Sequence, residues 1–471
     1  MRKLILALPL AGLLTGCGSE PTSLSIPNPS TTQPGASGAK AGQESAAATV
    51  QKTGPSAASG SIESPVVQQL ISKARSAVVT GQNLVAVESI SQAIGISPED
   101  ADLFRMRADV YVRLREMANA RADFSTAIRL QPERADFRNY RGYFLMSQGL
   151  TKEAVEDFNE AIKLDVKHAP AWNNRGLVSL AYSEYQKAEA DFSKAIEADR
   201  QFADGWNNRG FARMKQDKHD DAIADLKEAI RLNEKYATAW NNLGLVYMAR
   251  EQYEEAARAF TRLIEVSPMD ARWYNHRRSA LLKLERFDEV QQDSNQIEWL
   301  TGLTQLTQQA NANGRDVRVW INRGEYLMTG NQYGAAIQDF TRALMLNPGN
   351  TDALTGRAEA WLATKDLQNA IQDCDESIVV SPTPRAYSVR ADVWLALNNL
   401  DQAIQDFETA GRFDDAVVNA YEKRSQAYRE KNEIEKADAD AQRAADLRAA
   451  LKGQAQKPTP TEPEPGFVPN P

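Results

Sequence analysis

Apolar residues recur at spacings of three and four along most of this chain, which is the pattern of amphipathic helices. In one stretch, Ala188, Phe192 and Ala195 follow one another at steps of four and three residues, with polar residues between them. Comparable stretches come in pairs from Val67 to Leu451. The pattern therefore predicts an all-α chain that is built of helical hairpins.

The hairpins repeat with a period of 34 residues. Trp172, Trp206 and Trp240 stand 34 residues apart and open the phrases WNNRG, WNNRG and WNNLG. When Ala169 is counted as position 1, positions 8, 20 and 27 hold small residues, which let two helices approach closely. Proline at position 32, as at Pro268, cannot continue a helix and closes the repeat. A fixed period of this size is typical of a solenoid, in which each repeat packs on its neighbours.

This order of a large residue, Gly, Ala, an aromatic residue, Ala and Pro resembles the tetratricopeptide repeat, a helix–turn–helix unit. The resemblance implies an all-α solenoid, or superhelix, of eleven repeats. Seven repeats span residues 67–304, and the last is degenerate because Arg278 stands where Gly is expected. Four more span 317–451. The polar stretch 305–316 between the two blocks interrupts the register, either as a hinge or as a helix that extends beyond its repeat.

Arginine at position 7 and aspartate at position 23 occur together in nine repeats. The pairs are Arg107 and Asp123, Arg141 and Asp157, Arg175 and Asp191, Arg209 and Asp225, Arg277 and Asp293, Arg323 and Asp339, Arg357 and Asp373, Arg390 and Asp406, and Arg424 and Asp440. The repeat that begins at Ala237 has Leu243 and Ala259 at these places, so the two charges also disappear together. The arginines are either a stripe that binds an anionic ligand or partners in structural ion pairs. We prefer the ion pair, which predicts that each guanidinium lies within salt-bridge distance of an aspartate.

Positions 5 and 6 hold asparagine in three consecutive repeats. These residues are Asn173, Asn174, Asn207, Asn208, Asn241 and Asn242. In tetratricopeptide arrays the first helices line the concave surface. The asparagines thus resemble the asparagine ladder in the repeat domain of the O-linked N-acetylglucosamine transferase, whose side chains hold an extended peptide. An amide has both donors and an acceptor, as a peptide group does.

Positions 9 and 12 of the same helices are mostly apolar. The residues assigned to the predicted peptide groove are Tyr143, Met146, Leu177, Phe211, Met214, Leu245 and Met248. Flexible methionines suit a surface that adapts to its partner. The alternative is that the asparagines bridge neighbouring helices and that the apolar residues pack between repeats.

The N-terminus reads MRKLILALPLAGLLTGC. Arg2 and Lys3 precede an apolar stretch that is too short to span a bilayer and has the form of a secretion signal. The last four residues, ending in Cys17, resemble the lipobox of bacterial lipoproteins. That resemblance implies removal of residues 1–16, lipid on Cys17, and a place in the bacterial envelope. Gly18 favours the outer membrane, facing the periplasm. The alternative is an ordinary signal peptide in which this cysteine is incidental.

Two flanking segments have the composition of disordered chain. Residues 17–66 are rich in Ser, Thr, Gly, Ala and Pro, and they predict a flexible linker between the lipid anchor and the repeats. Residues 452–471 predict a disordered, Pro-rich tail. The net charge of −8, without a basic cluster, argues against nucleic acid as a partner.

The sequence shows no catalytic constellation. The three histidines, His168, His219 and His276, fall at different positions of their repeats and have no ligands at metal-binding spacing. Cys374 is expected to be a buried apolar filler. We therefore predict no enzyme activity, catalytic residue, metal, cofactor or small-molecule substrate.

The predicted function is that of a membrane-anchored scaffold that binds other proteins or peptides in a groove. The alternative is a non-catalytic regulator, either cofactor or inhibitor, of an envelope peptidase or a cell-wall enzyme.

Overall fold

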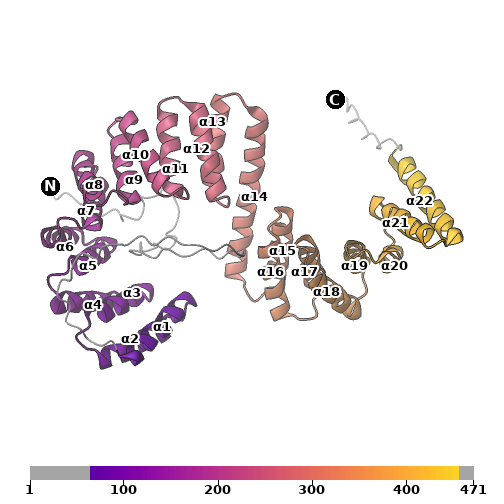
Figure 1. Cartoon of the computed structure of the whole chain (residues 1–471), viewed down its shortest axis with the longest axis horizontal. Helices are drawn as coiled ribbons and strands as arrows, with labels where there is room; N and C mark the ends of the chain where they lie inside the picture. The colour runs from indigo at the N-terminus through magenta and orange to yellow at the C-terminus, as the bar shows by residue number, and fades with distance from the viewer. Residues whose placement is uncertain (1–63, 456–471) are drawn as a thin grey trace, which may run out of the picture. The chain divides into compact units, whose positions relative to one another are not determined.

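The computed structural model describes residues 64–455, and this range contains 22 α-helices and no strand. Consecutive helices form hairpins, so the eleven predicted repeats correspond to eleven pairs of a helix A and a helix B (Figure 1). The helices are α1 (Pro65–Val79), α2 (Asn83–Ile96), α3 (Ala101–Arg113), α4 (Met117–Leu130), α5 (Ala135–Ser147), α6 (Thr151–Leu164), α7 (Ala169–Ala181), α8 (Tyr185–Ala198), α9 (Ala203–Met214), α10 (His219–Leu232), α11 (Ala237–Ala249), α12 (Tyr253–Val266), α13 (Ala271–Lys283), α14 (Phe287–Ala312), α15 (Val317–Thr329), α16 (Tyr333–Leu346), α17 (Thr351–Ala363), α18 (Leu367–Val380), α19 (Pro384–Ala396), α20 (Leu400–Ala410), α21 (Asp415–Glu430) and α22 (Ile434–Ala455).

The ends of the helical region differ slightly from the predicted boundaries. Helix α1 begins at Pro65, two residues before the predicted first repeat, and α22 continues to Ala455, four residues into the predicted tail. The signal segment, Cys17, the rest of the linker up to residue 63 and the tail from residue 456 lie outside the described residues.

Glycine at position 8 lets the two helices of a hairpin touch. A Cβ atom added to Gly176 would lie 2.7 Å from Cε1 of Phe192, the position-24 residue of the opposite helix. The glycines at position 8 of four other repeats are equally close to the residue at position 24, as Gly142 is to Phe158. The position-24 residues of these five repeats, four phenylalanines and Leu226, are buried in the core of their hairpins. The small and large positions read from the sequence are thus one contact.

The turn from helix A to helix B has the same backbone in all eleven repeats. Position 15 is left-handed everywhere, with φ between 57° and 74°. Only Gly81 and Gly149 are glycine; the other nine are Arg115, Ser183, Asp217, Glu251, Glu285, Asn331, Lys365, Asn398 and Asn432. In one such turn the Glu184 N–H donates to the Ser179 carbonyl at 2.9 Å, which satisfies an end carbonyl of the helix.

Tryptophan at position 4 closes the loop between repeats. The Trp172 Nε1–H donates to the Val166 carbonyl, six residues upstream, at 2.8 Å. Trp206, Trp240 and Trp320 make the same bond to the carbonyl six residues before them, at 2.9–3.0 Å. The large residue at this position therefore fills space and also ties a polar backbone group of the loop.

The described chain divides into two compact units, and the division passes through α13. The first unit holds the described residues up to Pro268 together with Ser279–Arg286. The second holds Met269–Arg278 together with the described residues from Phe287 onward.

Helix α14 belongs to the second compact unit and explains the interrupted register. It runs without a break for 26 residues to Ala312, so the segment 305–316 is an extended helix followed by a short turn. The ring of Trp299, on α14, stacks on the ring of Tyr326 of α15, with the centroids 5.9 Å apart and an angle of 7° between the planes. Trp299 Nε1–H also donates to Thr329 Oγ1 at 3.1 Å. The extra turns of α14 thus form the packing surface for the next helix.

Candidate functional site

All nine Arg–Asp pairs predicted from the sequence are present in the structure. In each pair, Nε donates to Oδ2 and Nη2 donates to Oδ1 of the aspartate sixteen residues later. The two distances are 2.8 and 2.7 Å between Arg357 and Asp373. All nine aspartates are buried. This parallel two-bond geometry joins helix A to helix B of the same repeat.

The third edge of the guanidinium reaches the preceding repeat. Nη1 of Arg107 donates to Ser91 Oγ at 3.0 Å, and Nη1 of Arg175 donates to Asn159 Oδ1 at 2.8 Å. Arg141, Arg209 and Arg357 make the corresponding bond to Ser125, Ser193 and Thr341. The hydrogen bonds with Asp123 raise the pKa of Arg107. Because hydrogen bonds to neighbouring helices occupy the guanidinium groups, these arginines are structural and do not form a free stripe for anions.

The aromatic residue at position 4 covers this ion pair. The guanidinium of Arg175 lies 4.8 Å from the Trp172 ring centroid, and that of Arg209 lies 4.9 Å from the Trp206 centroid. A cation over an aromatic face is attracted by the ring quadrupole. The ring and the ion pair thus pack on each other within one repeat.

The asparagines bond to one another across repeats. The Asn174 amide donates to Asn139 Oδ1 at 2.9 Å, and the Asn208 amide donates to Asn173 Oδ1 at 2.8 Å. Asn242 repeats the contact by donating to Asn207 Oδ1 at 3.0 Å. This is the bridging role that the sequence left as the alternative to a peptide ladder.

Most of these amides are also out of solvent. Asn139, Asn173, Asn174, Asn207 and Asn242 are buried, and the other two are half-buried: Asn208 and Asn241. Asn139 was missed by sequence reasoning because the residue after it is tyrosine, so the double asparagine is absent from its repeat. Its place at position 5 was the available signal.

The seven apolar residues predicted for the groove lie on the A helices of four consecutive repeats. We call this set the apolar row: Tyr143 and Met146 on α5, Leu177 on α7, Phe211 and Met214 on α9, and Leu245 and Met248 on α11. All seven are half-buried. Helices α5, α7, α9 and α11 contact one another in that order, so the row follows one A-helix face.

The buried part of the apolar row packs between repeats. Leu177 and Phe211 pack against the cluster that contains Leu180 and Ala212, and Met146 packs against the cluster around Phe144. Burial raises the pKa of the Tyr143 hydroxyl. The row therefore stabilises the stack and still leaves part of each side chain accessible.

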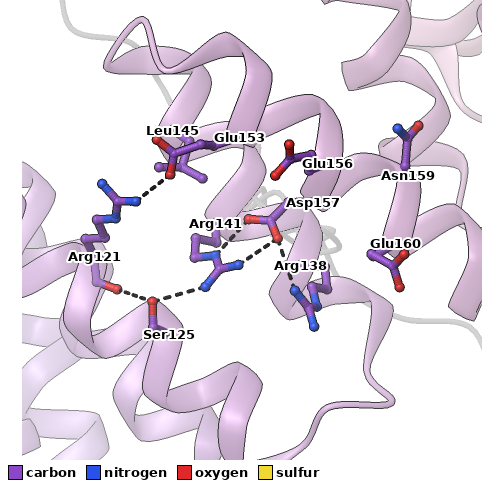
Figure 2. Close-up of a pocket in the computed structure, with 10 residues that line it drawn as sticks. All are labelled: Arg121, Ser125, Arg138, Arg141, Leu145, Glu153, Glu156, Asp157, Asn159 and Glu160. Atoms are coloured by element: carbon purple, nitrogen blue, oxygen red, sulfur yellow. Dashed lines mark hydrogen bonds and ion pairs between the residues drawn. The ribbon is translucent and has the colours of Figure 1, made fainter.

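Two of the hollows on the other side of the A helices, between successive B helices, adjoin α6. One of about 500 Å³ is lined from α4, α5 and α6, as Figure 2 shows. The other, of about 840 Å³, is lined from α6, α7 and α8 and includes Tyr182. Neither hollow is lined by a residue of the apolar row.

The remaining reactive side chains have structural places. His168 is the N-cap of α7, where its Nδ1 accepts from the Ala171 N–H at 3.1 Å, and His219 is the first residue of α10. Cys374 is fully buried, and burial raises the pKa of its thiol to about 12. Within residues 64–455, no three His, Cys, Asp or Glu side chains gather in a way that could hold a metal ion. Of the helices in the same range, none has the length and apolar character required to cross a membrane.

Models of the tetratricopeptide repeat match the chain over residues 71–135, 105–165, 145–203 and 321–384, with further matches at 212–250 and 237–270. Together these ranges cover more than half of the chain. They leave out residues 271–320, which hold the degenerate repeat and the extended helix α14, and the last two repeats, after residue 384.

Several solved structures are similar to parts of the chain. The pilF protein of Pseudomonas aeruginosa is 17% identical, with a TM-score of 0.39 over 42% of this chain and 90% of its own. PilW, described as a widely conserved type IV pilus biogenesis factor, is 20% identical, with a TM-score of 0.40 over 46% of this chain and 99% of its own. YrrB, described as a TPR protein with an unusual peptide-binding site, is 21% identical, with a TM-score of 0.31 over 39% and 94%.

At these identities the similarity concerns the fold alone. A search of the curated proteins found no match. The assignment therefore depends on the repeat models and on the eleven hairpins themselves. Tetratricopeptide repeats are in general non-catalytic modules that bind proteins or peptides. This chain carries tetratricopeptide repeats, and its described residues form the α-solenoid of that repeat family.

Proposed function

We propose that this chain is a non-catalytic scaffold of the bacterial envelope, and that its apolar row binds an apolar segment of a partner protein. The observation that carries the proposal is the half-exposure of seven apolar side chains in four consecutive repeats. A surface helix normally presents polar residues to water, so a contiguous apolar set indicates an interaction site.

The asparagines favour recognition through side chains rather than through a peptide backbone. The donors of Asn174, Asn208 and Asn242 already have acceptors in the preceding repeat. A ligand that used them would first have to break bonds between repeats, which leaves buried polar groups without partners. The apolar row, with its three methionines, is complementary to a partner segment that has apolar side chains along one face.

The second compact unit presents different chemistry at the corresponding place. Position 9 is Glu325, Glu359 and Asp392 in three consecutive repeats of that unit. Arg385 donates to Glu359 at 2.8 Å and to Glu325 at 3.2 Å, and Arg412 lies 2.6 Å from Asp392. These carboxylates are paired within the unit. An apolar partner segment is therefore assigned to the first compact unit.

The test compares proteins retained by the full chain with those retained by Phe211→Asp. A charge in the middle of the apolar row must be desolvated by an apolar partner, so we expect the partner to be lost. Tyr182→Asp is the matched control, because Tyr182 is 64% exposed and lies outside the row. Circular dichroism melts are measured first, to check that both variants fold. Equal retention by wild type and Phe211→Asp, measured by crosslinking and mass spectrometry, refutes the proposed site.

The membrane anchor is part of the same proposal. The arrangement of Arg2, Lys3, the short apolar stretch and Cys17 supports it, since this is the form of a bacterial lipoprotein signal. Labelling with radioactive palmitate in bacterial cells, followed by separation of inner and outer membranes, tests both the lipid and the location. We expect labelling of the wild type and none of Cys17→Ser; equal labelling rules out the anchor.

A further inference from the structure

The repeat that begins at Ala135 departs from the others at position 4. In seven repeats, an aromatic ring at position 4 lies over the arginine of position 7. These aromatic residues are Phe104, Trp172, Trp206, Tyr274, Trp320, Tyr387 and Tyr421. In this repeat the residue is Arg138. A second guanidinium therefore replaces the aromatic ring beside Arg141.

The two guanidinium groups share one carboxylate. Arg141 uses both oxygens of Asp157, with Nε–Oδ2 and Nη2–Oδ1 distances of 2.7 and 2.8 Å. Arg138 approaches the same carboxylate only through Nη1, at 3.4 Å from Oδ1. Its Nε is buried and has no hydrogen-bond partner. Figure 2 shows the two arginines on either side of Asp157. Arg138 thus has an incompletely balanced charge and an unsatisfied donor.

The hollow above these arginines also carries carboxylates. Glu156 and Glu160, both on α6, line it together with Arg138. Glu156 makes no ion pair within residues 64–455, and Glu160 is 3.6 Å from Lys163. Arg121 and Glu153, which also line the hollow, are paired with each other and leave no charge for a ligand. One cation without a full partner therefore faces two acids across a space of about 500 Å³.

We propose that this hollow binds a small zwitterion of the α-amino acid class. Its carboxylate binds the accessible end of the Arg138 guanidinium, whose side chain is 28% exposed, and its ammonium lies against Glu156 and Glu160. An anion alone would meet the two glutamates, and a cation alone would leave Arg138 unsatisfied, so only a ligand with both charges is complementary. This site does not depend on the proposed function of the apolar row.

The test uses three probes with the same isobutyl end. L-leucine has both charges, 4-methylpentanoate lacks the ammonium, and 3-methylbutylamine lacks the carboxylate. Saturation-transfer NMR and titration with the full chain at pH 7 measure their dissociation constants. We expect L-leucine to bind at least tenfold more tightly than either of the other two probes. Equal affinities, or no binding of L-leucine, overturn the proposal.

Two variants of Arg138 localise the binding. Arg138→Gln removes the charge, and Arg138→Trp restores the ring found at this position in the next repeat. Both are expected to abolish binding of L-leucine while leaving the circular dichroism spectrum and melting curve intact. Arg129→Gln is the charge-matched control, because Arg129 is exposed and lies outside the hollow. Wild-type affinity in Arg138→Gln or Arg138→Trp, or loss of binding in Arg129→Gln alone, overturns the assignment.

Discussion

The Arg357–Asp373 pair can be removed one partner at a time, because the chain contains an uncharged version of the same contact. The repeat at Ala237 has Leu243 and Ala259 at positions 7 and 23, and both are buried. The informative variants are therefore Arg357→Leu, Asp373→Ala and the double substitution, which copies the residues of the repeat at Ala237.

The structure sets the expected magnitudes. The side chain of Asp373 is 5% exposed and that of Arg357 is 21% exposed. Arg357→Leu leaves a buried carboxylate without its two charge-assisted hydrogen bonds, which costs about 3 kcal/mol. Asp373→Ala leaves a guanidinium that keeps Thr341 as a partner and reaches water, so the cost is about 2 kcal/mol. The double variant has no unpaired charge and should lie within about 1–2 kcal/mol of the wild type.

The assay is a double-mutant cycle on the full chain. Urea unfolding followed by circular dichroism reports the overall change in stability. Hydrogen exchange of the amides in α17 and α18 reports the local change, which is needed because long repeat arrays do not unfold in one step. We expect a coupling of about 3–4 kcal/mol between the two sites. If the double variant is as unstable as the sum of the single variants, the pair has no coupling and the reasoning is wrong.

Three further predictions follow from single positions. Gly176→Ala should lower the melting temperature, at a cost of about 1–3 kcal/mol, because the new Cβ meets the phenylalanine ring of helix B. Gly334→Ala should raise the melting temperature, because Gly334 is helical and no atom lies within 4 Å of the position that its Cβ would take. Burial raises the pKa of Glu189, but hydrogen bonds, of which that from Lys218 is the largest, outweigh burial and lower it to about 2. The folded pKa lies below the usual 4.5, so this stabilisation is present above pH 4.5 and is lost as the pH falls towards 2; Glu189→Gln should flatten the melting temperature in that window. Cys374 should react with a thiol reagent at pH 8 only at the rate of unfolding, since its pKa of about 12 keeps it protonated; rapid labelling of the folded chain would contradict this.

The sequence alone was sufficient for the hairpin and for its charge pair. Glycine at position 8 and a ring at position 24 are readable because contacts within one repeat recur at a constant separation in the chain. The Arg–Asp pairs are readable for the same reason: the aspartate is always sixteen residues after the arginine, and both residues are replaced together. Nine copies of the charge pair and five of the glycine contact supply the evidence that a single globular domain would lack.

The left-handed turn at position 15 could not be predicted in this way, although it is also local. Its left-handed backbone is occupied by Ser183, Lys365 and other residues that do not mark such a conformation. The turn is imposed by the hairpin, whose packing outweighs the cost of a left-handed residue, about 1–2 kcal/mol.

Only the tertiary structure decided what the asparagines and the extra segment do. From the sequence, Asn208 could bind either a ligand or the preceding repeat. Its 2.8 Å hydrogen bond to Asn173 forms only when two repeats are stacked. The polar stretch after Leu300 reads equally well as a hinge or a helix until α14 is seen to pack on α15. In the same way, Arg138 is an isolated substitution in the sequence and becomes half of a shared carboxylate contact in the fold. The sequence thus determined what each repeat is, because those contacts are local and periodic; the stacking decided which polar groups are left for a partner, because that depends on what the neighbouring repeat already uses.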